Sequence, residues 1–211
     1  MSIMRKVLAI SLVLLGGCSG CEREVIVEKR PKPKPVENEF GRFEDNISAT
    51  WLDDDGRKMM LDKEFAYVDP RGKRWVAPQG SVVDGASIPE LFWSITGGPF
   101  TGKYRKASVV HDVACVEKTE PWEDVHKMFY EACLCGGVEQ TKAKLMYWAV
   151  YNYGPQWRPV YSIAMTEAGE VRAARMVAHA PPPPTEDMLK KAEAFFEANN
   201  PSLEEIKTLE F

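Results

Sequence analysis

The sequence predicts an α+β protein, in which a small antiparallel sheet is followed by a bundle of about three helices and a C-terminal amphipathic helix. Two observations lead to this fold class. Between Ile47 and Val83, short apolar runs alternate with turn signals, as in a small sheet. Between Tyr104 and Tyr153, longer segments carry the start and stop signals of helices. With 211 residues, the chain has room for one ordinary domain with appendages.

The strands of the predicted sheet come first in the folded part. They correspond to the runs ISATWL, KMMLDKEFAYV and RWVAP. Asp69-Pro70-Arg71-Gly72 separates the last two runs and is a favourable turn tetrad, because Pro stands at its second position and Gly at its fourth. The segment 84–103 that follows is rich in Gly and Pro and is long for a connection, so we expect it to be functional.

Three helices are expected next. Pro121 suits a first helical position, and Gly-Gly and Gly-Pro pairs end the second and third helices. The predicted ranges are Tyr104 to Val116, Pro121 to Cys135 and Val138 to Tyr153. Residues 157–178 resemble a weak strand followed by a short helix or irregular segment.

The segment TEDMLKKAEAFFEANN after the proline run predicts the C-terminal amphipathic helix, opened by a Thr cap. We expect this tail either to fold back on the domain or to contact a protein partner, whose identity the sequence does not indicate.

The composition is that of a folded protein. Hydrophobic residues make up 45% of the chain and charged residues 27%, which excludes the disordered and fibrous classes. Lys and Arg number 27 against 31 Asp and Glu, so the net charge of -4 gives the whole protein no electrostatic reason to bind nucleic acid. We therefore expect no nucleic-acid partner.

The N-terminus has the order of a bacterial export signal. Arg5 and Lys6 precede an apolar run from Val7 to Leu15, which is about half the roughly 20 residues that a membrane-spanning helix needs. A cleaved signal peptide is therefore favoured over a permanent membrane anchor.

Leu15-Gly16-Gly17-Cys18 resembles the lipobox of bacterial lipoproteins. This resemblance implies that residues 1–17 are removed and that acylated Cys18 attaches the protein to the lipid bilayer. Ser19, where Asp would signal retention in the inner membrane, implies an outer-membrane location facing the periplasm.

Four regions follow from these features: a signal peptide over 1–17, a Lys/Pro-rich stalk over 18–37, a globular domain over 38–180, and a Pro linker with the tail helix over 181–211. Alternating Lys and Pro favour an extended spacer. The basic residues between 29 and 34 can also rest on anionic lipid headgroups.

Cys21, Cys115, Cys133 and Cys135 remain after acylation of Cys18, and an exported protein can form disulfides. A bridge between Cys115 and Cys133 is disfavoured. In an antiparallel helix pair with its turn near residue 118, the two residues lie about 16 Å apart along the axis, and a disulfide tolerates roughly 7 Å between Cα atoms.

Two of the three histidines, His111 and His126, lie in consecutive predicted helices. They are equally far from the turn between these helices, so they can face each other. Asp112 follows His111 in the Ala/Val-rich run KASVVHDVAC, and buried His and Asp side chains need partners, a metal or a catalytic role. The alternative is a satisfied polar pair that only orders the preceding loop.

A pattern of spaced residues extends from the loop into the helices: Asp84-x-Ala86-Ser87-Ile88-Pro89, Gly102-x-Tyr104 and His111-Asp112, with Phe129, Tyr147 and Gly154 beyond them. This pattern resembles a bacterial and phage domain family of unknown function. The likeness covers roughly residues 64–158. Because that family has no settled activity, the resemblance implies a fold rather than a reaction.

The loop and the His-Asp pair are also similar to bacterial secreted phospholipases A₂. The likeness implies a calcium loop at Asp84, Gly85 and Ser87, with Asp84 and Asp112 as metal ligands and His111 as the base that activates water. Calcium takes such oxygen ligands and polarises an ester carbonyl.

One departure from the phospholipases is the residue three positions before Phe129, which is His126 instead of an orienting Asp. Two outcomes are open. His126 can join His111, Asp112 and Asp84 in a transition-metal site, since imidazole suits Zn²⁺ better than Ca²⁺. Alternatively, an esterase fold has lost its chemistry and now binds instead of cleaving.

The sequence therefore predicts a membrane-anchored envelope lipoprotein that acts as a metal-assisted lipid or ester hydrolase, with catalytic His111 and His126 and a divalent metal, Ca²⁺ or Zn²⁺. The alternative is a non-catalytic binding or structural envelope lipoprotein, in which the His-Asp cluster has a structural role.

Overall fold

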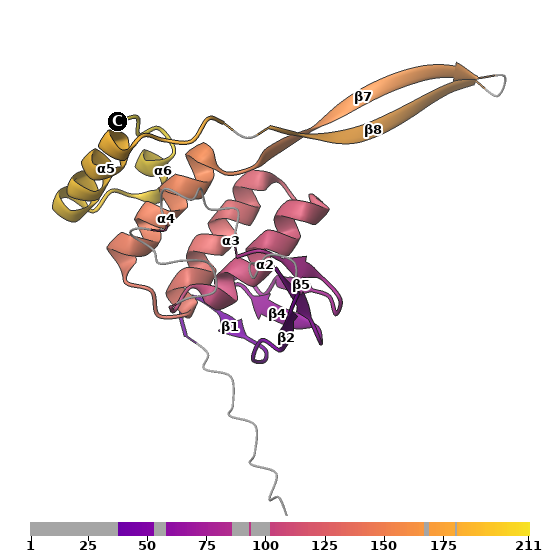
Figure 1. Cartoon of the computed structure of the whole chain (residues 1–211). Coiled ribbons are helices and arrows are strands. Elements are labelled where there is room, and N and C mark those ends of the chain that lie inside the picture. Colours follow the sequence, from indigo (N-terminus) through magenta and orange to yellow (C-terminus); the bar gives the residue numbers. More distant parts are fainter. Residues whose placement is uncertain (1–37, 53–57, 86–92, 94–101, 167–168, 180) are drawn as a thin grey trace, which may run out of the picture. The chain divides into compact units, whose positions relative to one another are not determined.

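A computed structural model describes residues 38–52, 58–85, 93, 102–166, 169–179 and 181–211, and Figure 1 shows their arrangement. Short antiparallel strands come first, helices follow, and a long hairpin and a helical tail complete the chain, so the α+β class is confirmed. The short strands are β1 (Arg42–Phe43), β2 (Ala49–Trp51), β3 (Met59–Leu61), β4 (Phe65–Val68), β5 (Arg74–Ala77) and β6 (Val82–Val83).

The short strands form two antiparallel sheets with the orders β1-β4-β5 and β2-β3-β6. Strands β4 and β5 pair from Phe65 opposite Ala77 to Val68 opposite Arg74. The predicted turn joins them, because the Asp69 carbonyl accepts a hydrogen bond from the Gly72 amide at 2.9 Å. The Asp69 carboxylate also accepts from the backbone amides of Arg71 and Lys73, which holds the turn closed.

Three helices follow the sheets: α2 (Arg105–Glu117), α3 (Trp122–Cys135) and α4 (Gln140–Tyr153). Each boundary lies within two residues of the prediction. Helix α2 ends at Lys118, whose left-handed backbone returns its amide to the Ala114 carbonyl. The short turn after Lys118 sends α3 back along α2, and α2 also packs against β4, β5 and β6 (Figure 1). Helix α2 therefore contacts both α3 and the short strands β4, β5 and β6.

The prediction for residues 157–178 was right about the first strand but wrong about the short helix or irregular segment after it. These residues belong to a hairpin of two eleven-residue strands, β7 (Gln156–Thr166) and β8 (Gly169–His179), paired from Gln156 opposite His179 to Thr166 opposite Gly169. The second strand contains Ala, Arg and Met, which favour helix in isolation. Continuous pairing with β7 outweighs that local preference, because cross-strand contacts stabilise a strand more than its intrinsic propensity does.

The tail folds back on the domain, the first of the two expected arrangements. Thr185 caps α5 (Glu186–Asn199), and Ser202 caps α6 (Leu203–Ile206) with a capping box. Phe196 packs beside Trp148 of α4, whose indole N–H donates to the Leu209 carbonyl at 3.2 Å. These contacts anchor both tail helices to α4.

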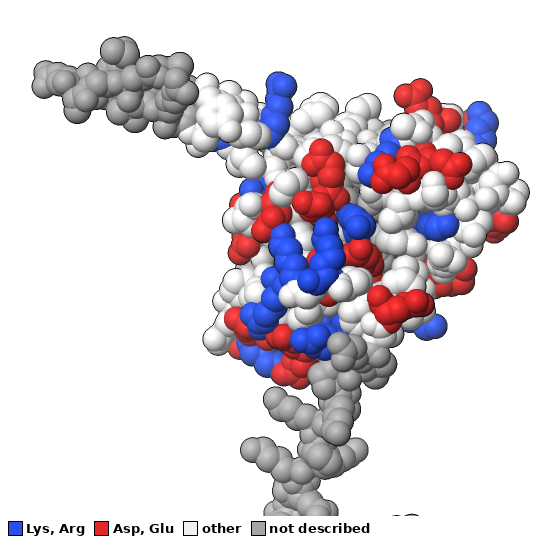
Figure 2. Space-filling view, turned by 180° about the vertical axis from the view of Figure 1, so that it is seen from behind, with Lys and Arg blue, Asp and Glu red and all other residues white. Residues whose placement is uncertain are grey.

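Within the described residues, no helix combines the length and apolar character needed to cross a bilayer. The face seen in Figure 2 carries Lys and Arg side chains interspersed with Asp and Glu. Charges of both signs are therefore mixed on this face.

Candidate metal centre

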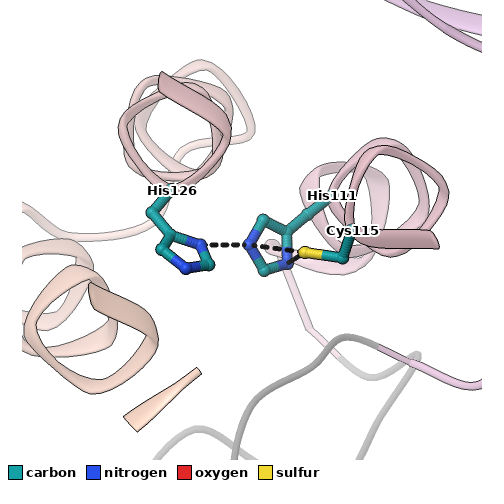
Figure 3. A group of neighbouring side chains, drawn as sticks. All are labelled: His111, Cys115 and His126. Carbon is teal, nitrogen blue, oxygen red and sulfur yellow. Dashed lines mark hydrogen bonds between the residues drawn. The ribbon is translucent and has the colours of Figure 1, made fainter. Parts of the chain in front are cut away.

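Three potential metal ligands meet between α2 and α3. His111 and Cys115 stand four residues apart on α2, a spacing that places both side chains on one helical face. His126 reaches toward them from α3 (Figure 3). One ligand atom from each residue lies within 4.8 Å of the other two, and all three residues are buried. We call these residues the His-Cys-His cluster.

The two histidines are in direct contact, as their spacing predicted. His111 Nε2 lies 2.9 Å from His126 Nδ1, and the ring centroids are 5.1 Å apart. Cys115 Sγ lies 3.6 Å from His111 Nε2 and 4.0 Å from His111 Nδ1. His126 thus occupies the place where the phospholipase likeness expects a carboxylate to orient the base.

A backbone carbonyl selects the tautomer of His126. His126 Nε2 lies 3.1 Å from the Pro155 carbonyl oxygen, which can only accept a hydrogen bond. Nε2 therefore carries the proton, and Nδ1 presents a lone pair to the cluster. It follows that His111 Nε2–H donates to His126 Nδ1 in the metal-free state.

Burial keeps both imidazoles neutral. Neither residue has any exposed surface. Burial lowers the pKa of His111 well below its ordinary value, and the nearby His126 lowers it further. Burial lowers the pKa of His126 to about 4, although the hydrogen bond to Pro155 acts in the opposite direction. Neutral imidazole is the form that binds metals.

The donor set fits a transition metal. In a tetrahedral zinc site, bond lengths of about 2.0–2.1 Å to nitrogen and 2.3 Å to sulfur place two nitrogens roughly 3.3 Å apart and nitrogen and sulfur roughly 3.6 Å apart. The 3.6 Å between Cys115 Sγ and His111 Nε2 matches, and the 2.9 Å between the histidine nitrogens needs only a small opening. Nitrogen and sulfur are poor ligands for Ca²⁺, which takes oxygen.

The surroundings of the cluster are aromatic. Trp122 and Trp157 pack edge-on against His126, with ring centroids at 5.6 and 6.4 Å, and Phe129 lies 4.6 Å from the His111 ring. Together with the Pro155 carbonyl, these rings hold the histidines in fixed orientations, as outer neighbours of metal ligands do.

Asp112 and Asp84 lie outside the cluster. Asp112 is buried, and its Oδ2 accepts a hydrogen bond from the Gly85 amide at 2.9 Å. Gly85 has a φ of 105°, a conformation that favours glycine. Asp84 is exposed. Asp112 therefore holds the start of the predicted functional loop, while Ser87 and Cys18 lie outside the described residues.

Cys115 is the site residue that sequence reasoning missed, because we considered it only as a disulfide partner. Its four-residue spacing from His111 was the available signal. Cys115, Cys133 and Cys135 are all thiols in the structure, so the disfavoured bridge between Cys115 and Cys133 is absent.

Two curated proteins of Sinorhizobium fredii (strain NBRC 101917 / NGR234) are similar to this chain. "Uncharacterized protein y4jT" is 48% identical over 119 residues, which cover 56% of this chain and 35% of that protein. "Uncharacterized protein y4iH" is 39% identical over 103 residues, which cover 49% of this chain and 43% of that protein. The chain thus spans less than half the length of either relative. No solved structure matches the chain.

The family comparison covers the central part of the chain. Residues 59–150, which include β3 to β6 and nearly all of α2 to α4, match a family model described as "Protein of unknown function (DUF1353)". All three residues of the His-Cys-His cluster lie within the match. The predicted resemblance to a bacterial domain family of unknown function is therefore confirmed over residues 59–150.

Proposed function

We propose that this domain binds a transition-metal ion, for which Zn²⁺ is the best match, through His111, Cys115 and His126. The observation that carries the proposal is the convergence of two imidazole nitrogens and one thiol within 4.8 Å, with the His126 tautomer set by Pro155. A ligand set of this kind is typical of zinc, and it also suits copper.

A structural role for the ion follows from burial. All three ligands are buried, and they come from both α2 and α3, two helices that a short turn joins. An ion that binds the folded chain but not the unfolded chain raises the free energy of unfolding in proportion to the logarithm of its concentration. The metal would therefore stabilise the packing of α2 against α3.

The proposal is tested with Co²⁺ as a spectroscopic substitute for Zn²⁺. Titration of the purified protein should produce the charge-transfer absorption of a thiolate-bound cobalt ion, and Zn²⁺ should displace it. Cys115→Ser should abolish this absorption. Cys133→Ser is the matched control, because Cys133 is also buried but lies outside the cluster. No absorption with the unaltered protein, or equal loss in both variants, contradicts the proposal.

A second candidate is a metal-assisted hydrolase of a lipid or another envelope ester. The number of protein ligands favours it, since three ligands leave a fourth position open, as in catalytic zinc sites. The metal would polarise the ester carbonyl and lower the pKa of a bound water. In this candidate His111 and His126 hold the ion, and Asp112 holds the Gly85 amide at the start of the loop.

Hydrolysis is tested with phospholipid and short-chain ester substrates. Metal-dependent cleavage that is lost in His111→Gln and kept in Cys133→Ser would support the hydrolase. Metal binding without any cleavage leaves the structural role and excludes hydrolysis of these substrates.

The site belongs, in our proposal, to an envelope lipoprotein anchored through acylated Cys18. The lipobox-like Leu15-Gly16-Gly17-Cys18 supports this location. Cells expressing the chain should incorporate labelled palmitate into it and retain it in the outer-membrane fraction, and Cys18→Ala should abolish both. Labelling that persists in Cys18→Ala contradicts the anchor.

A further inference from the structure

The root of the β7–β8 hairpin touches the His-Cys-His cluster directly. The Pro155 carbonyl, one residue before β7, accepts the Nε2–H of His126. Trp157, the second residue of β7, packs edge-on against the same ring. Its indole N–H also donates to the Glu120 carbonyl at 2.8 Å, in the connection between α2 and α3. One metal ligand thus shares its outer contacts with the first residues of the hairpin.

Beyond its root, the part of the hairpin whose side chains the structure describes is largely exposed. Residues 158–161 of β7 and 174–176 of β8 are exposed, including Val160, Tyr161 and Met176, which are 41%, 69% and 42% exposed. A hairpin of two strands is at best marginally stable in water without further packing. The order of β7 and β8 therefore depends on the contacts at the root.

The joint between α4 and the hairpin is sharp. Gly154 ends α4, and a side chain there would collide with the Val150 carbonyl. Pro155 follows with a restricted backbone. Because the joint has little freedom, a shift of the His126 ring at Pro155 is passed to β7 and is not absorbed by a flexible linker.

We infer that metal occupancy of the His-Cys-His cluster controls the order of the β7–β8 hairpin. This inference rests on the proposed metal-binding function. Coordination through Nδ1 fixes the His126 ring and strengthens its Nε2–H as a donor to Pro155. Without the metal, Nδ1 of this ring accepts one hydrogen bond from His111, while Nε2–H still donates to Pro155. Metal binding therefore strengthens the contacts at the root. The β7–β8 hairpin is then more ordered when the site is occupied than when it is empty.

Coupling of this kind is reciprocal. If the bound metal stabilises the ordered root by some factor, the ordered root must raise metal affinity by the same factor. A substitution that weakens the root should therefore lower metal affinity. Trp157→Phe keeps a ring against His126 and removes the N–H that bonds Glu120. We expect it to weaken Zn²⁺ binding about fivefold, within the range of ordinary coupling energies. Tyr161→Phe is the matched control, since this exposed ring lies in the same strand away from the cluster.

Hydrogen exchange with and without Zn²⁺ tests the inference, with Co²⁺ absorption reporting binding independently. Zn²⁺ should slow exchange in 156–161 and 174–179 at least tenfold, and the β4–β5 pair should change much less. Cys115→Ser should remove the effect. If the ion binds but hairpin exchange is unchanged, or slows equally everywhere, the inference is wrong and the proposed function stands. If no ion binds, both fail.

Discussion

His111 and Asp112 are neighbours on α2, yet they serve two different regions of the molecule. His111 faces α3, where it contacts His126, and it also contacts Cys115 one turn further along α2. The Asp112 carboxylate accepts a hydrogen bond from the Gly85 amide, at the start of the loop that follows β6. Successive side chains on a helix point about 100° apart, so one dipeptide can reach two surroundings. A His-Asp pair in a sequence therefore need not be one catalytic unit.

Removal of His126 should have the largest effect on stability and metal binding. It should disrupt the contacts of His111 with α3 and leave the contact between Asp112 and Gly85 in place. His126→Ala deletes a fully buried ring and leaves the Pro155 carbonyl without its donor. Truncation of large buried side chains lowers the free energy of unfolding by about 3–5 kcal/mol, and we expect a loss near 4 kcal/mol together with the loss of metal binding. Urea unfolding and Co²⁺ absorption measure the two effects.

His179→Ala is the control for His126→Ala, because His179 is exposed on β8. It should lower stability and Co²⁺ binding far less than His126→Ala does, although His179 pairs with Gln156 at the hairpin root. If His126→Ala unfolds the protein, His126→Gln keeps a side chain with amide donors and should still abolish the cobalt absorption. Normal metal binding by either His126 variant contradicts our assignment of this residue as a ligand.

Acidification should have the next largest effect on the metal-free protein. The pKa of His126 is about 4 in the folded chain and 6.5 in the unfolded chain. Between these values the unfolded state binds more protons, so stability is complete above the unfolded pKa and falls as the pH drops toward 4. The pKa of His111 is shifted in the same direction. His126 alone should account for about 2 kcal/mol lost between pH 7 and pH 5.

Urea unfolding at the two pH values measures this loss, and the low end stays at pH 5 so that most carboxyl groups remain ionised. Saturating Zn²⁺ should protect the protein, because protons and the metal compete for the same nitrogens. A free energy of unfolding that does not change between pH 7 and pH 5 would show that the histidines are not held neutral by burial.

The sequence predicted the helices, which depend on local signals. It also predicted the contact between the two histidines, which depends on their equal distance from a turn. Helix boundaries followed from Pro and Gly punctuation, and the meeting of His111 with His126 followed from their equal distance from Lys118. The β7–β8 pairing was missed because each strand is stabilised by the other. The carbonyl of Pro155 had no residue-type signal at all, since every residue carries such an acceptor.

Asp112→Asn should have the smallest effect on stability. It tests most directly whether Asp112 and His111 act separately. Asparagine keeps an oxygen that can accept from the Gly85 amide, but it replaces a charged acceptor with a neutral one. We expect a loss of about 1 kcal/mol in the free energy of unfolding. Hydrogen exchange at the Gly85 amide should become faster, whereas Zn²⁺ affinity should stay within about twofold of the unaltered protein, since Asp112 is not in the His-Cys-His cluster.

The opposite result would restore the reading of His111 and Asp112 as one unit. A tenfold fall in Zn²⁺ affinity with unchanged exchange at Gly85 would make Asp112 a metal ligand, as the phospholipase likeness implied. Exposed Asp84 supplies the control, because Asp84→Asn lies in the same loop without burial. If Asp84→Asn and Asp112→Asn weaken Zn²⁺ binding together, the metal lies toward the loop side of α2, and the division between the two faces of the helix is wrong.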